Sequence, residues 1–280
     1  MTVLIVGHSQ DPTLKHFACY LRKQNPQCDW LFLNQDELGN TIHLCSQGFS
    51  FKDGFIAHID ITGVWNRLVT MPNDPIQKQS VIYLYYLLDE VYPNVINRPK
   101  YCTSNFSKHH QLRLISTTYL QMPSSIISNQ PYKWMQKIKH PNEWIYKSLS
   151  CTRSIVTTIK SRRYKQNSLT EPMLIQKKII GTPIRVHVVG KQLFSVTCTS
   201  DHIDYRYGSY LHMDTTSLPN HIESDIVRIH KSLKLGISGV DLIQQGDHYS
   251  ILEINTCPGF CSFDLEFNIC DALYRLIQLY

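Results

Sequence analysis

The amino-acid sequence predicts an α/β protein, and three features of its 280 residues carry that prediction. The first hundred residues alternate strand-like and helix-like patterns, which favours a parallel sheet with crossover helices. From residue 172 onward, apolar runs separated by glycine-containing turns indicate several strands in succession. A chain of this length forms one large domain or two to three smaller lobes, and no internal repeat or low-complexity linker divides it.

The first hundred residues begin with a short apolar strand at TVLIVG (2–7). An amphipathic helix follows at PTLKHFACYLRKQ (12–24), because its apolar residues recur at i, i+3, i+4 and i+7. The second strand is expected at CDWLFLN (28–34), and further β-rich stretches surround TIHLCSQ and GFIAHIDITGVWNRL. The strongest helix of this half is IQKQSVIYLYYLLDEVY (76–92).

The rest of the chain is predicted to contain more strands than helices. A helix is expected from Ser107, a short strand at 122–129 and another at 144–149, while residues 130–170 are the least regular. The strands after residue 172 lie at PMLIQKKI, PIRVHVVG and QLFSVTCTS. Two further helices are predicted, at residues 221–236 and at 263–280.

Composition and charge limit the classes of partner. The formal charge of +6 is a mild excess, and its basic clusters at 133–140 and 160–167 are solvated faces or attract phosphate or acidic substrates. No arginine-rich tail or aromatic-interleaved motif indicates nucleic acid, and no apolar run is long enough to span a membrane. The nine cysteines form no CxxC pair, so reduced, structural thiols are expected. The N-terminus is a poor signal peptide, and a cytoplasmic location is expected.

Near the C-terminus, SGVDLIQQGDHYSILEINTCPGF (238–260) places acids inside two apolar runs. Gly246 and Asp247 form the expected turn between the runs. If the turn centres near Asp247, Asp241 and Glu253 are equidistant from it, and we then expect them to pair directly across an antiparallel hairpin.

A third polar group, Asn255, follows Glu253 by two residues. Alternation along a strand puts these two side chains on one face with Ile251, and Leu252 and Ile254 on the other. Three oxygen donors then converge, and two carboxylates so close repel each other unless a cation or proton intervenes. Mg²⁺ takes such hard oxygen ligands. The plain structural alternative is a hairpin with solvent-facing acids on one side.

The runs GVDLI and ILEINTCPGF resemble the C-terminal metal motif of the ATP-grasp superfamily, particularly of RimK-like carboxylate–amine ligases. The resemblance implies an N-terminal Rossmann-like pre-ATP-grasp domain and two α+β lobes that clasp ATP. It implies that Asp241, Glu253 and Asn255 hold Mg²⁺, or Mn²⁺, against the ATP phosphates. The expected domains are residues 1–97, a central lobe at 98–170 and a C-terminal lobe at 171–280.

The resemblance extends upstream in the family's order and covers residues from about 95 to 275. NRP (97–99) resembles the entry to the central lobe, LIQKKI (174–179) the linker strand along which adenine stacks, and PIRVHVVG (183–190) the arginine strand. Arg185 would then stabilise the transferring phosphate, and an arginine between valines needs an acidic or phosphate partner once buried. The other residues that the resemblance assigns to ATP are Lys108, Lys147, Gln176, Lys177, Lys178 and Ile179. Alone, Lys147 also fits a strand-end surface lysine, Lys108 a simple helix N-terminus and Gln176 an edge residue of an apolar strand.

A narrower resemblance concerns GVWNRL (63–68) and DYR (204–206), which are similar to the WxR and DWR stretches of graspetide (microviridin-type) macrocyclases. It implies that Arg206 contacts phosphate and that Arg67 faces the substrate; a surface charge is the plain reading of Arg67. His187 shares the face of Arg185 and is either structural or a substrate contact.

Two departures from the RimK-like pattern concern the nucleotide. The lid loop after the strand lysine is usually rich in glycine, whose backbone N–H groups cover the phosphates, whereas here it reads SLSCTRS. An acidic residue commonly precedes the arginine strand, but Pro183 and Ile184 stand there, which leaves the ribose contact unassigned.

The resemblance implies an ATP-dependent carboxylate–amine ligase. A carboxylate of an amino acid or peptide would be activated as an acyl phosphate and joined to an amine or hydroxyl, with ADP and phosphate released. Three alternatives stay open: a graspetide-type macrocyclase acting on a precursor peptide, a small-molecule kinase of inositol-phosphate type on the same fold, and an ATP-binding pseudoenzyme. A homodimer is compatible with the resemblance, because dimers are common among similar ligases.

Overall fold

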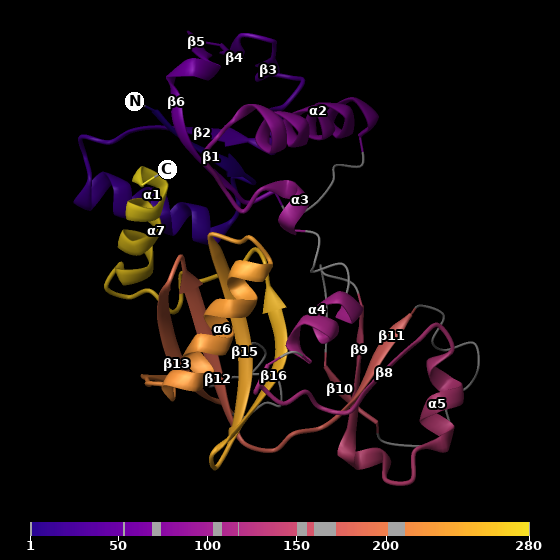
Figure 1. Cartoon of the computed structure of the whole chain (residues 1–280). Helices are drawn as coiled ribbons and strands as arrows, with labels where there is room; N and C mark the ends of the chain where they lie inside the picture. Colours follow the sequence, from indigo (N-terminus) through magenta and orange to yellow (C-terminus); the bar gives the residue numbers. More distant parts are fainter. Residues whose placement is uncertain are drawn as a thin grey trace.

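The computed structural model describes residues 2–52, 54–68, 74–102, 108–116, 118–149, 156–159, 172–200 and 211–279. Within these ranges the strands form four sheets, and helices cover them as the α/β prediction requires (Figure 1). One parallel sheet belongs to the N-terminal part, and the two larger antiparallel sheets belong to the central and C-terminal parts.

The N-terminal part contains the predicted parallel sheet, in the order β2-β1-β6-β7. Its strands and helices are β1 (Thr2–Gly7), α1 (Pro12–Gln24), β2 (Asp29–Asn34), β6 (Ile61–Asn66), α2 (Pro75–Tyr86) with its π-helical continuation (Leu87–Val91), and β7 (Val95–Ile96). A small antiparallel sheet joins β3 (His43–Leu44), β4 (Gly48–Phe51) and β5 (Gly54–Ala57). Asp11 and Asp74 cap α1 and α2, each followed by a proline that suits the first helical position.

The central part is an antiparallel sheet in the order β10-β9-β11-β8. Its elements are α3 (Pro99–Cys102), α4 (Lys108–Ile115), β8 (Ser125–Ser128), α5 (Pro131–Lys137), β9 (Trp144–Ser148), β10 (Thr157–Thr158) and β11 (Met173–Lys177). Strand β11 pairs with both β8 and β9, so the expected boundary at residue 171 falls before a strand of the central sheet. The division into domains otherwise stays a prediction.

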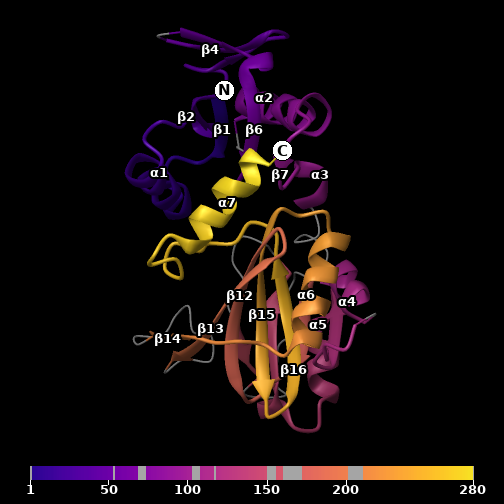
Figure 2. The same ribbon diagram turned by 60° about the vertical axis from the view of Figure 1, so that its left-hand side comes forward.

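The C-terminal part is a five-stranded antiparallel sheet in the order β14-β13-β12-β15-β16 (Figure 2). Its elements are β12 (Thr182–Val189), β13 (Gln192–Ser200), β14 (Leu211–Thr215), α6 (Asn220–Ser232), β15 (Ile237–Gln245), β16 (His248–Asn255) and α7 (Asn268–Gln278). Helix α6 packs against one face of β12, β15 and β16 and buries an aliphatic core there. The residues that alternate with this core, including Arg185 and Asp241, therefore lie on the opposite face.

The last helix differs from its prediction in both start and position. It begins at Asn268 rather than near residue 263, because Phe267 adopts a left-handed backbone (φ 61°) and the carboxylate of Asp264 accepts the N–H groups of Ile269 and Cys270. Helix α7 leaves the C-terminal sheet and lies beside α1, sharing one apolar core with β1 and β6 (Figure 1).

Candidate active site

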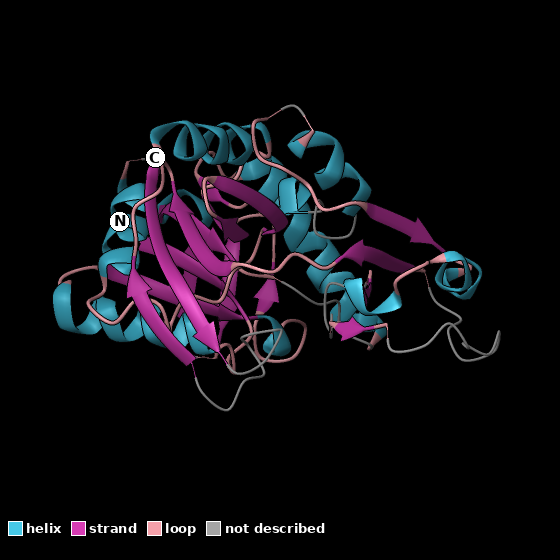
Figure 3. Ribbon diagram, turned by 90° about the horizontal axis from the view of Figure 1, so that it is seen from below, coloured by secondary structure: helices cyan, strands magenta, loops and turns pink. Residues whose placement is uncertain are grey.

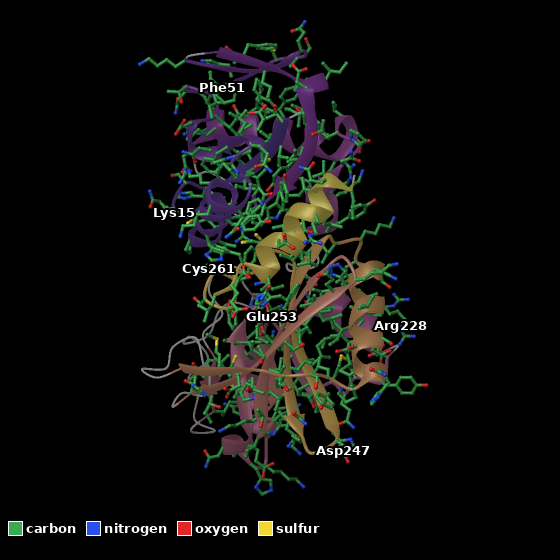
Figure 4. All side chains as sticks on the ribbon, turned by 90° about the vertical axis from the view of Figure 1, so that its left-hand side faces the viewer. Lys15, Phe51, Arg228, Asp247, Glu253 and Cys261 are labelled. Carbon is green, nitrogen blue, oxygen red and sulfur yellow. The ribbon has the colours of Figure 1, made fainter. Side chains whose placement is uncertain are left out.

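The hairpin of β15 and β16 has the predicted register at its acids. Asp241 lies directly opposite Glu253, and the turn between the strands contains Gly246 in a left-handed conformation (φ 57°). Figure 4 shows Asp247 at the turn and Glu253 at the other end of β16, where the hairpin approaches the N-terminal part. The predicted pairing of the two carboxylates is therefore confirmed.

Between the turn and Glu253 the alternation of side chains differs from the prediction, because the register shifts between Asp241 and Leu242. Leu242 pairs with Ile251, so Leu252 is the extra residue of a β-bulge. Ile251 consequently lies in the core under α6 instead of on the face of Glu253. Leu252 and Glu253 both line the cavity between the central and C-terminal sheets.

Asp241 and Glu253 belong to a row of paired residues that crosses the C-terminal sheet. Arg185 on β12 lies opposite Asp241, and its Nη1 donates to the Asp241 Oδ1 at 2.8 Å. The guanidinium is buried, with 6% of the residue exposed. It passes over Gly239, where an added Cβ would lie 2.3 Å from Nη2. Gly239 thus provides the room that places Arg185 against the acids.

A second cation reaches the row from the central sheet. Lys147 on β9 is 5% exposed, and its Nζ lies 3.5 Å from the Glu253 Oε2. Because β9 and β16 belong to different sheets, this ion pair bridges the central and C-terminal parts. The site therefore places two adjacent carboxylates between two buried cations, and charges in such a position require partners.

The cavity between the two sheets contains the predicted linker. Residues 176–179 line it together with Lys147, Asp241 and Glu253. Gln176 is buried and donates from Nε2 to the Ser125 hydroxyl at 3.0 Å, so its side chain is engaged within the central sheet. The N–H of Lys178 donates to the Glu143 carbonyl, which fixes the strand end.

The remaining predicted residues differ in their surroundings, and some lie outside the described part of the chain. The amide Oδ1 of Asn255 accepts the N–H of Cys257 at 2.9 Å, at the end of β16. Lys108 is the first residue of α4, and its side chain lies outside the described residues, as do Arg206 and residues 150–155 of the expected lid.

His187 is buried beside Arg185, and burial, followed by the Arg185 charge, lowers the pKa of His187 well below its ordinary value. His187 is therefore neutral near pH 7.

Arg67 is buried and lies apart from the cavity between the sheets. Its Nε and Nη2 bind the Asp11 carboxylate at 2.9 and 2.8 Å, and its Nη1 donates to the Pro258 carbonyl at 2.7 Å. The plain reading of this residue as a surface charge is wrong, because 5% of it is exposed.

Sequence reasoning missed two amides that hold the hairpin. Asn97 accepts the N–H of Ile237 at 3.0 Å and donates to the carbonyls of Ile237 and Thr256 at 2.8 and 2.6 Å. Gln111 donates to the Ile254 carbonyl at 2.7 Å and accepts its N–H at 3.3 Å. Asn97 belongs to the NRP run, whereas no local pattern marks Gln111.

Sequence and structure comparisons agree on one family. The family model described as ATP-grasp domain matches residues 106–259, more than half of the chain, and the chain therefore belongs to the ATP-grasp family. None of the curated proteins matches it. No described helix is long and apolar enough to cross a membrane.

The whole chain resembles solved ATP-grasp proteins in fold. The macrocyclase MdnC of Microcystis aeruginosa MRC, solved with its precursor peptide MdnA, is 21% identical, with a TM-score of 0.82 and coverage of 100% of both chains. The ATP-grasp ligase PsnB, complexed with a phosphomimetic variant of a minimal precursor, Mg and ADP, is 20% identical, with a TM-score of 0.78 and 98% of each chain covered. A RimK domain ATP-grasp protein of Sphaerobacter thermophilus DSM 20745 is 13% identical, with a TM-score of 0.63 and coverage of 99% of this chain and 100% of that chain. The predicted ATP-grasp fold is therefore confirmed.

Proposed function

We propose that the protein is an ATP-dependent ligase that activates a carboxylate and joins it to an amine or a hydroxyl. One observation carries this proposal: the cross-strand row of Glu253, Asp241 and Arg185, with Lys147 facing it from the other sheet. Membership of the ATP-grasp family and the fold shared with peptide-modifying ligases support it.

ATP is proposed to bind in the cavity between the central and C-terminal sheets. Its adenine lies along residues 176–179, where the cavity lining includes the apolar Ile145 and Ile184. Its phosphates lie toward Lys147 and Arg185. Each of these cations contacts a carboxylate at 2.8–3.5 Å, so phosphate oxygens are alternative anionic partners for both.

The donors of the site fit a magnesium ion. Two carboxylates stand directly opposite each other, and Asn255 adds an amide oxygen one alternation further along β16. Hard oxygen donors of this kind suit Mg²⁺, and also Mn²⁺. Asp241, Glu253 and Asn255 would hold the ion, which would supply charge neutralisation for the phosphates of ATP.

The proposed reaction has two steps. An oxygen of the substrate carboxylate attacks the γ-phosphorus, the bond to the β-phosphate oxygen breaks, and ADP leaves with an acyl phosphate formed. The acceptor nitrogen or oxygen then attacks the acyl carbon, its proton is lost, and inorganic phosphate leaves. Arg185 and Lys147 donate hydrogen bonds to the charge that develops on the phosphoryl oxygens, and their fixed positions supply the rate enhancement.

A second cavity gives the carboxylate substrate an approach on the far side of Arg185. The row that crosses the sheet continues from Arg185 to Val196 on β13 and Thr215 on β14. These two residues line a groove, together with Phe194 and Phe263, which we call the β13–β14 groove. Arg185 thus lies between the proposed nucleotide cavity and the β13–β14 groove, which we propose admits a side chain or peptide segment.

A peptide is the proposed substrate class. The macrocyclase and ligase structures of the same fold contain precursor peptides and cover nearly the whole of this chain, which favours a peptide carboxylate over a free amino acid. A peptide that supplies both the carboxylate and the amine or hydroxyl would be cyclised, with the loss of one water per bond.

The test is ADP release from ATP and Mg²⁺ in the presence of amino acids and peptides, with the products analysed by mass spectrometry. A ligase product is lighter than its combined substrates by one water, whereas a kinase product is heavier than its substrate by one phosphoryl group. Asp241→Asn is expected to abolish turnover, and Asp247→Asn at the exposed turn is the matched control. Nucleotide binding without turnover for any substrate would contradict the proposal and indicate a pseudoenzyme.

A further inference from the structure

The loop of residues 257–260 follows the proposed metal strand directly. Its first N–H is held by the Asn255 side chain at 2.9 Å, so the position of this loop and the orientation of the amide are linked. The loop ends at Phe260, which is fully buried. Any element that fixes the 257–260 loop therefore also fixes Asn255.

The N-terminal part contacts this loop through Arg67 and Trp65 of the β6 region. Arg67 Nη1 donates to the Pro258 carbonyl at 2.7 Å, and the same guanidinium is oriented by Asp11 through two contacts shorter than 3 Å. The Trp65 ring stacks on Phe260 with centroids 6.1 Å apart and an interplanar angle of 24°. These contacts connect residues that are about 190 positions apart in sequence.

The C-terminal sheet contacts the same loop through His187. Its Nε2 lies 3.2 Å from the Gly259 carbonyl and 3.3 Å from the Arg185 Nε. In one neutral tautomer Nε2 donates to the carbonyl, and in the other it accepts from Arg185. A shift of Gly259 therefore changes the surroundings of the arginine that binds Asp241.

We propose that Arg67 and Asp11 are positioning residues, which hold the 257–260 loop so that Asn255 and Arg185 are placed for metal and phosphate. The inference rests on the proposed function, and it gives the N-terminal part a role in the chemistry without contact with the reacting atoms. It replaces the expectation that Arg67 faces the substrate, because all three of its donor groups have partners within the protein.

Packing alone accounts poorly for this arrangement. A buried ion pair is weak evidence for stability, because desolvation of the two charges offsets their attraction. Here the pair also aims a third donor at one backbone carbonyl of the loop. A charge-assisted hydrogen bond fixes direction as well as distance, which is what the placement of an adjacent ligand requires.

The test uses the full chain and the variants Arg67→Met, Arg67→Lys and Asp11→Asn. Methionine keeps an apolar stem and removes every donor, lysine restores one donor, and asparagine keeps the helix cap at position 11 while removing its charge. Leu88→Ala is the matched control, because Leu88 is fully buried in another core of the N-terminal part. It lowers stability without touching the loop.

Two measurements separate positioning from stability. Isothermal titration gives the ADP affinity with and without Mg²⁺, and ADP release gives kcat and KM for ATP. We expect Arg67→Met to lower both the Mg²⁺-dependent gain in ADP affinity and kcat by about 10- to 100-fold, the effect of an ångström-scale misplacement. The ADP affinity without Mg²⁺ and KM for ATP stay within about threefold, Arg67→Lys recovers part of the loss, and Leu88→Ala changes neither quantity.

Failure of this inference is distinguishable from failure of the proposed function. If the wild-type chain shows neither turnover nor a Mg²⁺-dependent gain, the proposed function is wrong and the inference falls with it. If the wild type shows both and Arg67→Met resembles Leu88→Ala at equal loss of melting temperature, the function stands and the positioning role is refuted.

Discussion

The substitution Gly239→Ala perturbs the proposed phosphate-binding arginine without replacing it. The new Cβ would lie 2.3 Å from Nη2 and 2.7 Å from Cζ of Arg185, and 2.9 Å from Cβ of Pro258. Real Cβ atoms essentially never approach other heavy atoms closer than 3.0 Å. The guanidinium must therefore move by roughly 1 Å to restore ordinary van der Waals separation.

A movement of this size breaks the contact that defines the site. The Nη1–Oδ1 distance between Arg185 and Asp241 is 2.8 Å, and about 1 Å more exceeds hydrogen-bonding range. Misplacement by about 1 Å costs on the order of 100-fold in rate, so kcat for ADP release is expected to fall by about that factor. Gly239 has no left-handed backbone that alanine would strain, and the stability cost is therefore the overpacking alone, about 1–3 kcal/mol.

The assay is steady-state ADP release combined with thermal unfolding. Gly54→Ala is the matched control, because nothing lies within 4 Å of its added Cβ. A double-mutant cycle with Arg185→Ala tests whether Gly239→Ala lowers kcat by displacing Arg185. Once the guanidinium is absent, Gly239→Ala is expected to lower kcat little further. Retention of kcat within about threefold, or a full additional loss in the Arg185→Ala background, would show that Gly239 does not act by placing Arg185.

Three further predictions concern stability and are read by urea unfolding. Gln111→Ala leaves the buried N–H and carbonyl of Ile254 without their partner, and the free energy of unfolding should fall by about 2–4 kcal/mol; an unchanged midpoint would contradict this. Burial lowers the pKa of His230 from 6.5 to about 4, so its unfolded form binds more protons in that window. Stability should then decline as pH falls from 6.5 toward 4, by up to about 3 kcal/mol, and His230→Gln should remove this part of the slope. Gly181→Ala would place Cβ 2.2 Å from the Gln244 carbonyl oxygen and should cost about 1–3 kcal/mol; a variant as stable as the wild type would show that the strand end relaxes freely.

Local sequence patterns predicted the parts of the site that lie on one hairpin. Alternation and a glycine-containing turn predicted Asp241 opposite Glu253, because both depend on residues less than fifteen positions apart. In the structure Gln245 pairs with His248, and this register brings Glu253 opposite Asp241 only through the bulge at Leu252. The β-bulge at Leu252 escaped prediction, because one extra residue in an apolar run leaves the composition unchanged. Because the bulge was not predicted, Ile251 was assigned to the face of Glu253, whereas it lies in the core under α6.

Contacts between distant segments could not be predicted in the same way. The ion pair of Lys147 with Glu253 depends on how two sheets approach each other, and no spacing in the sequence encodes that approach. The partners of Arg67 could not be predicted for the same reason, since the carbonyl to which it donates lies 191 positions away. The resemblance to ATP-grasp proteins supplied the order of the motifs, and the structure supplied their distances.

The position of α7 has a consequence for how the chain is made. Residues of β1 and α1 near the start share one apolar core with Ile269, Leu273 and Ile277 near the end (Figure 3 shows the helices and sheets from below). During synthesis the part of this core that α7 covers stays exposed until α7 has left the ribosome. A ribosome-bound chain that stops before residue 268 therefore exposes this surface to proteases and chaperones, and protection arrives in one late step.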